Sequence, residues 1–164
     1  IFHRKNSFED MQSVIHSERT AGGRCAETEF EAFVLNEMCQ FTGAFCNSLH
    51  CDELGHLCRV PYWMEPVRDE SEDEEATAPK YDASGYLCGA TGCGLCALYR
   101  LRDAGITHLK LVGRGNYTDF MEKDIRNLKA ALEILENTDT EAAFRTEMKK
   151  QIFPYGCSGS CYYL

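Results

Sequence analysis

The sequence predicts an α/β protein with parallel strands. Two segments of strand length, residues 29–35 and 106–112, are rich in apolar side chains, and segments with helical periodicity precede, separate and follow them. Strands that alternate with helices along a chain pair in parallel, because each helix carries the chain back across the sheet. At 164 residues with 44% hydrophobic content the chain can bury one core, so we expect a single domain over residues 1–164.

The amino-terminal part predicts one helix between two extended segments. Residues 1–3 have the pattern of a strand end, and Ser7 is a typical N-cap residue with Asp10 as its capping-box partner. The helix that follows has an apolar stripe made of Phe8, Met11, Val14 and Ile15. Residues 29–35 alternate and then become fully apolar, which favours a largely buried strand.

The second half predicts a helix, a strand and two further helices. A helix over Leu95–Ala104 is stopped by Gly105, and the strand at 106–112 follows. Thr118 is the expected cap of a long amphipathic helix, and a last helix covers about 140–151. The stripe of the long helix consists of Met121, Ile125, Leu128, Leu132 and Leu135.

Charge and hydropathy exclude some classes of function. The chain has 26 acidic and 17 basic residues, a formal net charge of −9, which argues against a broad phosphate-binding surface. Seven of the acids lie in residues 65–75, so residues 65–85 are expected to be an acidic, flexible loop insertion. No apolar run of about 18 residues predicts a membrane span, and residues 1–20 do not resemble a signal peptide, so a cytoplasmic location is expected. The first residue is Ile1, which indicates a processed chain or a piece of a longer one.

Ten cysteines carry the main functional signal. The first group is C-x6-C-x4-C-x6-C, the second contains a C-x2-C, and a C-x3-C lies near the carboxyl end. The members are Cys39, Cys46, Cys51 and Cys58, then Cys88, Cys93 and Cys96, then Cys157 and Cys161, with Cys25 apart. Clustered thiols beside glycines favour a metal site over a disulfide framework, because a chain with an adequate core does not need covalent staples.

The spacing leaves the kind of metal open. Zinc prefers short C-x2–4-C pairs, and the long intervals of the first group fit it poorly. An iron–sulfur cluster accepts irregular spacing, because its ligands approach from different segments. His50 and His56 are substitute ligands, whereas Cys25 and Cys88 are better explained as packing residues.

Other candidate site residues follow the predicted strands, where α/β proteins build their sites. The turn Gly113-Arg114-Gly115 precedes a helix and suits an anionic substrate or cofactor; the alternative is an ordinary turn with a surface arginine. Lys110 would be catalytic if its strand face lined a barrel interior, and a solvated face is the alternative. Glu37 is either a general base or a helix-starting acid.

Longer stretches of the chain resemble a known family. The strings at 31–46 (EAFVLNEMCQFTGAFC) and 95–115 (LCALYRLRDAGITHLKLVGRG), together with Cys58-Arg59, are similar to the collagenase-like peptidases, peptidase family U32. That resemblance implies a TIM-like barrel, of which this chain would hold the carboxyl-terminal part: a partial TIM-like barrel with a cysteine-rich insertion. A partial barrel leaves open sheet edges, so we expect a homo- or hetero-oligomer with a family member.

The same resemblance implies a cofactor and a role. Relatives hold a [4Fe–4S] cluster, and their pattern falls on Cys39, Cys46, Cys58 and Cys96, with Cys93 an equally good thiolate one turn away and Cys51 in reserve. It implies oxygen-independent hydroxylation or modification of RNA or of a quinone precursor. The alternatives are zinc as the metal, a collagenase-like peptidase, and a non-catalytic subunit that completes another chain's barrel. For a peptidase the sequence offers no legible base–nucleophile pair and no H-E-x-x-H motif.

Overall fold

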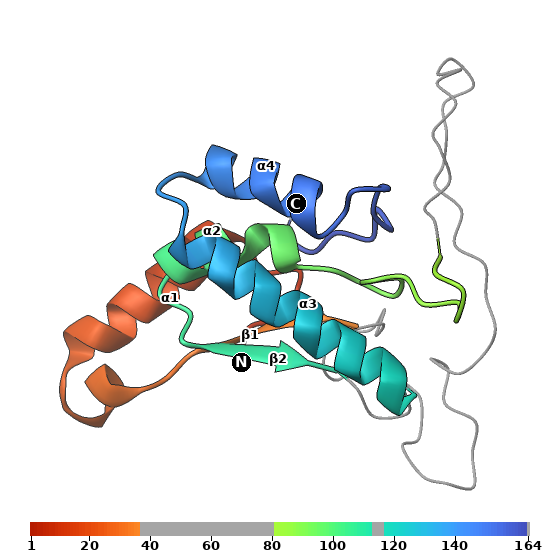
Figure 1. Cartoon of the computed structure of the whole chain (residues 1–164). Helices are drawn as coiled ribbons and strands as arrows, with labels where there is room; N and C mark the ends of the chain where they lie inside the picture. The colour runs from red at the N-terminus through yellow and green to blue at the C-terminus, as the bar shows by residue number, and fades with distance from the viewer. Residues whose placement is uncertain (37–80, 113–116, 164) are drawn as a thin grey trace, which may run out of the picture. The chain divides into compact units, whose positions relative to one another are not determined.

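The computed structural model describes residues 1–36, 81–112 and 117–163, shown in colour in Figure 1. Among these residues the helices and strands alternate as the sequence predicts. In chain order the elements are α1 (Phe8–Ala21), the 3₁₀ helix η1 (Gly23–Glu27), β1 (Glu31–Leu35), the 3₁₀ helix η4 (Leu95–Ala97), α2 (Leu98–Asp103), β2 (His108–Leu111), α3 (Thr118–Glu136) and α4 (Glu141–Gln151).

The strands form a parallel sheet, which confirms the α/β prediction with parallel strands. In the part of the chain that the structure describes, β1 and β2 pair in parallel with Glu31 opposite His108. Phe2 forms a single parallel bridge with Ala32, so the expected strand end at residues 1–3 is one bridge and no longer element. The partial TIM-like barrel stays a prediction, because two strands are compatible with a piece of a barrel and do not by themselves form one.

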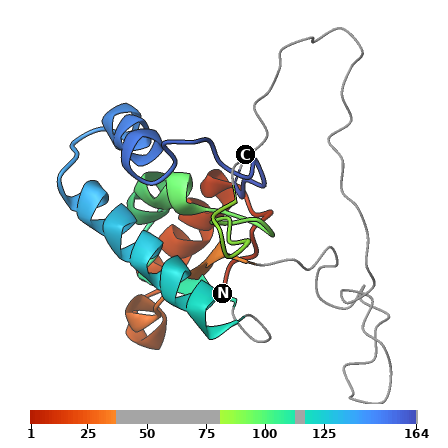
Figure 2. The same ribbon diagram turned by 45° about the vertical axis from the view of Figure 1, so that its right-hand side comes forward.

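One apolar core joins the helices to β1. Helices α2, α3 and α4 contact one another (Figure 2), and the 3₁₀ turn η4 packs against α2 and α4. Fully buried side chains come from each layer: Met11, Val34, Leu35, Leu95, Leu101, Phe144 and Met148. Each such side chain contributes about 1.5–3 kcal/mol by leaving water, so this core provides much of the folding free energy.

The helix starts test two predicted caps and the predicted start of the last helix. Ser7 Oγ accepts a hydrogen bond from the Asp10 backbone N–H at 3.0 Å, which confirms the cap of α1. Thr140 Oγ1 accepts from the Ala143 N–H at 3.2 Å, so the last helix begins where predicted. Thr118 was wrongly predicted as a cap: it is the first helical residue, and Tyr117 precedes it without a side-chain hydrogen bond.

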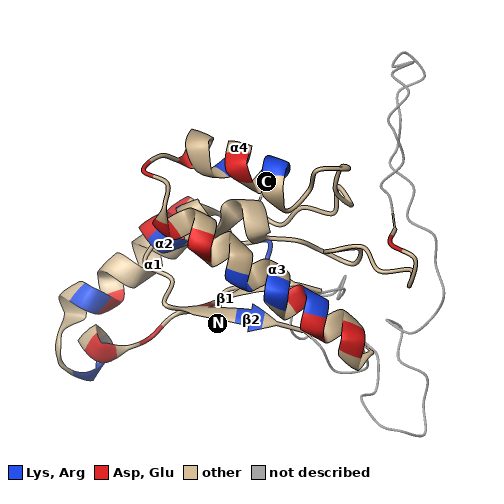
Figure 3. Cartoon of the chain, in the orientation of Figure 1, with Lys and Arg blue, Asp and Glu red and all other residues tan. Residues whose placement is uncertain are grey.

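Two stripe residues face solvent instead of the core. Val14 is 45% exposed and Ile125 is 56% exposed, so both were wrongly predicted as stripe residues that pack on the core. In α3 the reason is a rotation of the buried face toward Asp124, Ala131 and Leu135, which recur at helical spacing. Acidic and basic residues alternate along α3 (Figure 3), and Glu122, Arg126, Lys129 and Glu133 among them are exposed.

The predicted acidic loop at 65–85 ends in a hydrogen-bonded turn. Asp82 Oδ1 accepts from the backbone N–H groups of Ser84 at 2.9 Å and Tyr86 at 3.0 Å. Residues 65–80 lie outside the described residues. No helix in the described ranges is long and apolar enough to cross a membrane, and the cytoplasmic location stays a prediction.

Residues 92–94 connect the end of β1 to the carboxyl-terminal tail. The Gly94 N–H donates to the Val34 carbonyl at 2.7 Å, and the Asn36 N–H donates to the Gly92 carbonyl at 3.0 Å. On the other side, the Cys93 N–H donates to Ser160 at 2.8 Å and its carbonyl accepts from Tyr162 at 2.7 Å. Both backbone partners of Cys93 are therefore tail residues, while its neighbours hold β1.

Gly92 is required at this connection. Its φ is +149°, and a Cβ there would fall on the ring of the buried Tyr162. We expect Gly92→Ala to lower the free energy of unfolding by about 3 kcal/mol, from backbone strain and overpacking together. Urea unfolding followed by circular dichroism measures the change.

Gly85→Ala is the matched control for Gly92→Ala. Gly85 also has a positive φ, +78°, but nothing lies within 4 Å of an added Cβ. It should therefore cost only about 1 kcal/mol, from backbone strain alone. Equal losses in the two variants would contradict the role of the Tyr162 contact.

Candidate functional site

Asn36 marks the carboxyl end of β1, where the predicted site begins. Its φ is +63°, in the left-handed region that asparagine tolerates better than most residues. Its side-chain carbonyl accepts from the Thr91 hydroxyl at 3.3 Å, and its amide donates to the Asp124 carboxylate at 2.7 Å. The first residue after the strand is thus held at both ends of its side chain.

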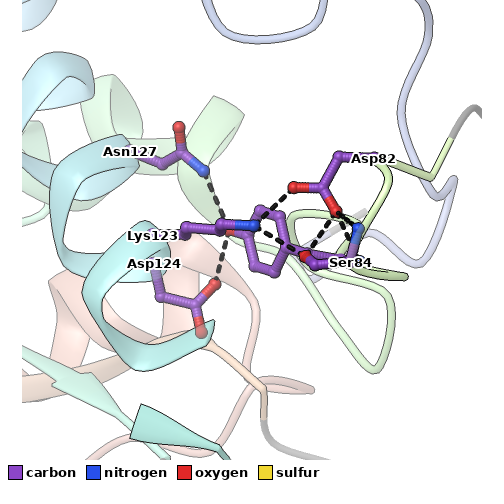
Figure 4. Close-up of polar contacts among 6 residues, drawn as sticks. Asp82, Ser84, Lys123, Asp124 and Asn127 are labelled. Carbon is purple, nitrogen blue, oxygen red and sulfur yellow. Dashed lines mark hydrogen bonds and ion pairs between the residues drawn. The ribbon is translucent and has the colours of Figure 1, made fainter. Parts of the chain in front are cut away.

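Asp124 is the buried charged residue of the described ranges, with 2% of its surface exposed. One carboxylate oxygen accepts from Asn36, and the other accepts from the Tyr86 hydroxyl at 2.9 Å. The Asn127 amide donates to the same hydroxyl at 2.8 Å (Figure 4). The network ties the end of β1, the segment before the C-x2-C and α3 to one carboxylate.

Burial sets the protonation of this network. It raises the pKa of Asp124, while the hydrogen bonds from Tyr86 and Asn36 favour the ionised form and oppose the rise. Burial also raises the pKa of Tyr86 above its usual range, with the nearby Cys88 and Asp124 adding to the effect. The phenol therefore stays a hydrogen-bond donor at neutral pH.

A second set of polar contacts, on the exposed side of Tyr86, involves Lys123, Asp82 and Ser84. Lys123 Nζ lies 2.5 Å from an Asp82 carboxylate oxygen and donates to the Ser84 hydroxyl at 2.8 Å (Figure 4). The Lys123 ammonium lies 5.1 Å from the centre of the Tyr86 ring. Hydrogen bonds from Lys123 and Ser84 hold the pKa of Asp82 well below its usual range, so the ion pair is present at neutral pH.

Five cysteines of the described part of the chain are free thiols: Cys88, Cys93, Cys96, Cys157 and Cys161. Cys88 is buried in the core, which confirms its prediction as a packing residue. The other four line one cavity of about 40 Å³ between η4 and the tail, with Phe153 and Tyr162 as apolar walls. The four are Cys93, Cys96, Cys157 and Cys161. The structure thus brings the C-x2-C and the C-x3-C together.

The thiols influence one another. Burial raises the pKa of Cys96, and the neighbouring Cys161 and Cys157 raise it further. Arg145 and Lys149 of α4 act in the opposite direction on the same thiol. Burial likewise raises the pKa of Cys93, against a hydrogen bond from the Leu95 backbone N–H. At neutral pH these groups are protonated unless a cation compensates their charge.

The predicted site residues divide between described and undescribed parts of the chain. Cys93 and Cys96 lie together at the cavity. Cys39, Cys46, Cys58, Glu37, Gly113, Arg114 and Gly115 lie outside the described residues, as do Cys51, His50 and His56. Within the described residues, no group of three or more His, Cys, Asp or Glu side chains already stands in a geometry that holds a metal ion.

Lys110 occupies a half-exposed face of β2. Its ammonium lies 3.4 Å from a Glu31 carboxylate oxygen and 5.4 Å from the centre of the Phe33 ring, both on the paired strand. The ion pair with Glu31 partly neutralises the positive charge of Lys110, with which a substrate anion would have to interact. Its catalytic role stays a prediction.

Sequence reasoning missed two parts of this arrangement. Asp124 lies at spacings of 4, 7 and 11 from Leu128, Ala131 and Leu135, so it shares their helical face, and that spacing was a readable signal. The proximity of the tail thiols to Cys93 and Cys96 depends on backbone pairing between distant segments. No local pattern carries that information.

Asp124→Asn tests the network at the end of β1. The amide can still accept from Tyr86, but its own N–H₂ then faces the N–H₂ of Asn36, so one donor loses its acceptor. We expect the free energy of unfolding at neutral pH to fall by about 2 kcal/mol, as for other buried donors left unpaired. Urea unfolding measures it.

Glu133→Gln is the matched control for Asp124→Asn. It removes one carboxylate from the exposed face of the same helix and should change stability by less than about 0.5 kcal/mol. If the two variants lost the same stability, the network would not be what holds Asn36.

Comparison with known proteins gives one match. The family model described as Peptidase family U32 matches residues 3–163, essentially the whole chain. No curated protein and no solved structure matches the chain.

Proposed function

Because the chain belongs to peptidase family U32, whose model covers residues 3–163, we propose that it is an iron–sulfur protein of that family. The proposed role is oxygen-independent hydroxylation or modification of RNA or of a quinone precursor. The observation that supports a cluster is the position of Cys93, which forms a backbone bridge with Leu35 at the end of β1. Cys39 follows Leu35 by four residues, so its Cα lies at most about 14 Å from that of Leu35.

The proposed ligands of a [4Fe–4S] cluster are Cys39, Cys46 and Cys58, with a fourth thiolate from the C-x2-C pair, Cys96 or Cys93. The structure describes two residues of this set, Cys93 and Cys96. Both are unpaired thiols that line one cavity, as ligands of a cluster would be. Zinc is the alternative metal for the same set. When bound, a cluster supplies one-electron transfer at a potential tuned by burial and by hydrogen bonds to its sulfurs.

The chain's own residues would bind and orient the substrate. Arg114, between Gly113 and Gly115 just before α3, would hold an anionic group with the unpaired N–H groups of the helix start. Lys110 would assist after exchanging its Glu31 partner for the substrate anion. Glu37, the residue after Asn36, would act as general base. The network around Asp124 would fix Asn36, the residue from which this segment departs.

The proposed architecture is the carboxyl-terminal part of a TIM-like barrel that works as an oligomer. In the described ranges β2 pairs with β1 only, so its other edge offers free backbone groups to another strand. A second family member, identical or not, would cover that edge. A non-catalytic role in completing another chain's barrel would show as constant co-purification with a cysteine-bearing homologue.

Metal analysis of anaerobically purified protein tests the cluster. The protein should be brown and hold about four iron and four sulfide per chain, the content of one [4Fe–4S] cluster. Cys39→Ser and Cys46→Ser should each lose most of the iron, because each removes a proposed ligand.

Cys88→Ala is the control, since this thiol is buried in the core and is not one of the proposed ligands. It should keep its iron. Colourless, iron-free wild-type protein from iron-replete anaerobic cells would refute the cluster. Release of peptides from gelatin, abolished by one point substitution, would instead favour the peptidase named in the family description.

A further inference from the structure

The C-x2-C and the C-x3-C are held next to each other by the backbone. Cys93 and Cys161 form a parallel bridge, fixed by hydrogen bonds from Cys93 to Ser160 and from Tyr162 to Cys93 at 2.8 and 2.7 Å. Residues paired across strands have neighbouring side chains. The other cysteine of each motif, Cys96 or Cys157, is three or four residues away along the chain, and all four thiols line one cavity.

The C-x2-C has the spacing of a metal knuckle. The backbone N–H of Leu95, two residues after Cys93, lies on the side of the Cys93 sulfur that favours the thiolate and lowers its pKa. N–H groups in such positions stabilise a thiolate and orient it toward a metal. Cys96 then follows within η4, on the next turn of the chain.

The lining of the cavity suits a metal ion held by thiolates. The cavity between the four thiols has a volume of about 40 Å³. Phe153 and Tyr162 limit the access of water. Arg145 and Lys149 lie close enough to favour the ionised form of Cys96, so they would offset the negative charge of a four-thiolate site.

We propose that Cys93, Cys96, Cys157 and Cys161 form a mononuclear zinc site of their own. The spacings C-x2-C and C-x3-C are those of the two short knuckles of a structural four-cysteine zinc site. Zinc binds as each thiol releases its proton to solvent. The described thiols are not yet gathered into a cage, so the tail closes on the ion by rotating at Gly156 and Gly159. Both have positive φ, +90° and +70°, and open space around them.

This site goes beyond the proposed cluster and competes with it for one ligand. If Cys93 and Cys96 both bind zinc, neither thiolate is available to bind iron. The cluster would then take its fourth thiolate from Cys51, which belongs to the first cysteine group. The two proposals therefore differ in what Cys96→Ser removes.

Elemental analysis of the anaerobic full chain separates the two metals. Wild type should carry one zinc beside its iron, since the quartet completes one tetrahedral site. Cys157→Ser/Cys161→Ser should lose that zinc and keep its iron, and Cys96→Ser should do the same. Ser160→Ala, between the two tail cysteines, is the matched control and should keep both metals.

The outcomes distinguish the two hypotheses. Loss of iron and retention of zinc in Cys96→Ser would overturn the zinc site and support Cys96 as a cluster ligand. Wild-type protein that contains zinc but no iron would refute the cluster. The zinc site would then be supported if the Cys157→Ser/Cys161→Ser variant loses that zinc. Equal zinc in wild type and the tail variant would overturn the zinc site, whatever the iron content.

Alkylation of the wild-type protein gives a readout that depends on no variant. N-ethylmaleimide modification mapped by mass spectrometry should be several-fold slower at Cys157 and Cys161 after addition of Zn²⁺ than after a chelator. Ser160→Ala should show the same protection, and Cys88, which lies in the core, should not respond. Identical modification of the tail thiols with and without zinc would overturn the proposal.

Discussion

The backbone pairing of residues 92–94 is the constraint on which the other features depend. This short segment pairs on one side with the end of β1 and on the other with the tail. Without it, Asn36 would lose its backbone partner, the tail would lose its register, and the four cavity thiols would separate. A segment this short can connect two distant parts of the chain because Gly92 and Gly94 allow the ring of Tyr162 to approach closely.

The polar network around Asp124 serves the same edge of the sheet from the helical side. A buried carboxylate is costly unless it is hydrogen-bonded, and both of its oxygens have donors here, from Asn36 and Tyr86. The network holds the strand end, the segment before the C-x2-C and α3 in one arrangement. By holding Asn36, the network fixes the residue after which the chain continues to its first cysteine group.

The elements of the fold were accessible from sequence, and the links between them were not. Alternating and helical periodicities reflect local burial, so β1, β2 and the four α-helices follow from nearby residues, and so does the cap at Ser7. The face of α3 was misjudged at Ile125, because a polar residue beside it takes the buried position for its hydrogen bonds. The grouping of Cys161 with Cys93 depends on tertiary pairing, and cysteine spacing alone did not reveal it.

The position of the tail contacts along the chain also bears on how the protein matures. Ser158 and Ser160 reach carbonyl groups 69 and 70 positions earlier, across β2, α3 and α4. Contacts between such distant positions close slowly, because the intervening chain must first be ordered. The helical elements therefore form before the tail docks. During that interval the tail residues do not yet shield Cys93 and Cys96 from solvent. Refolding under oxidising conditions would allow these thiols to form wrong disulfides, so a reducing agent is needed until the tail has docked.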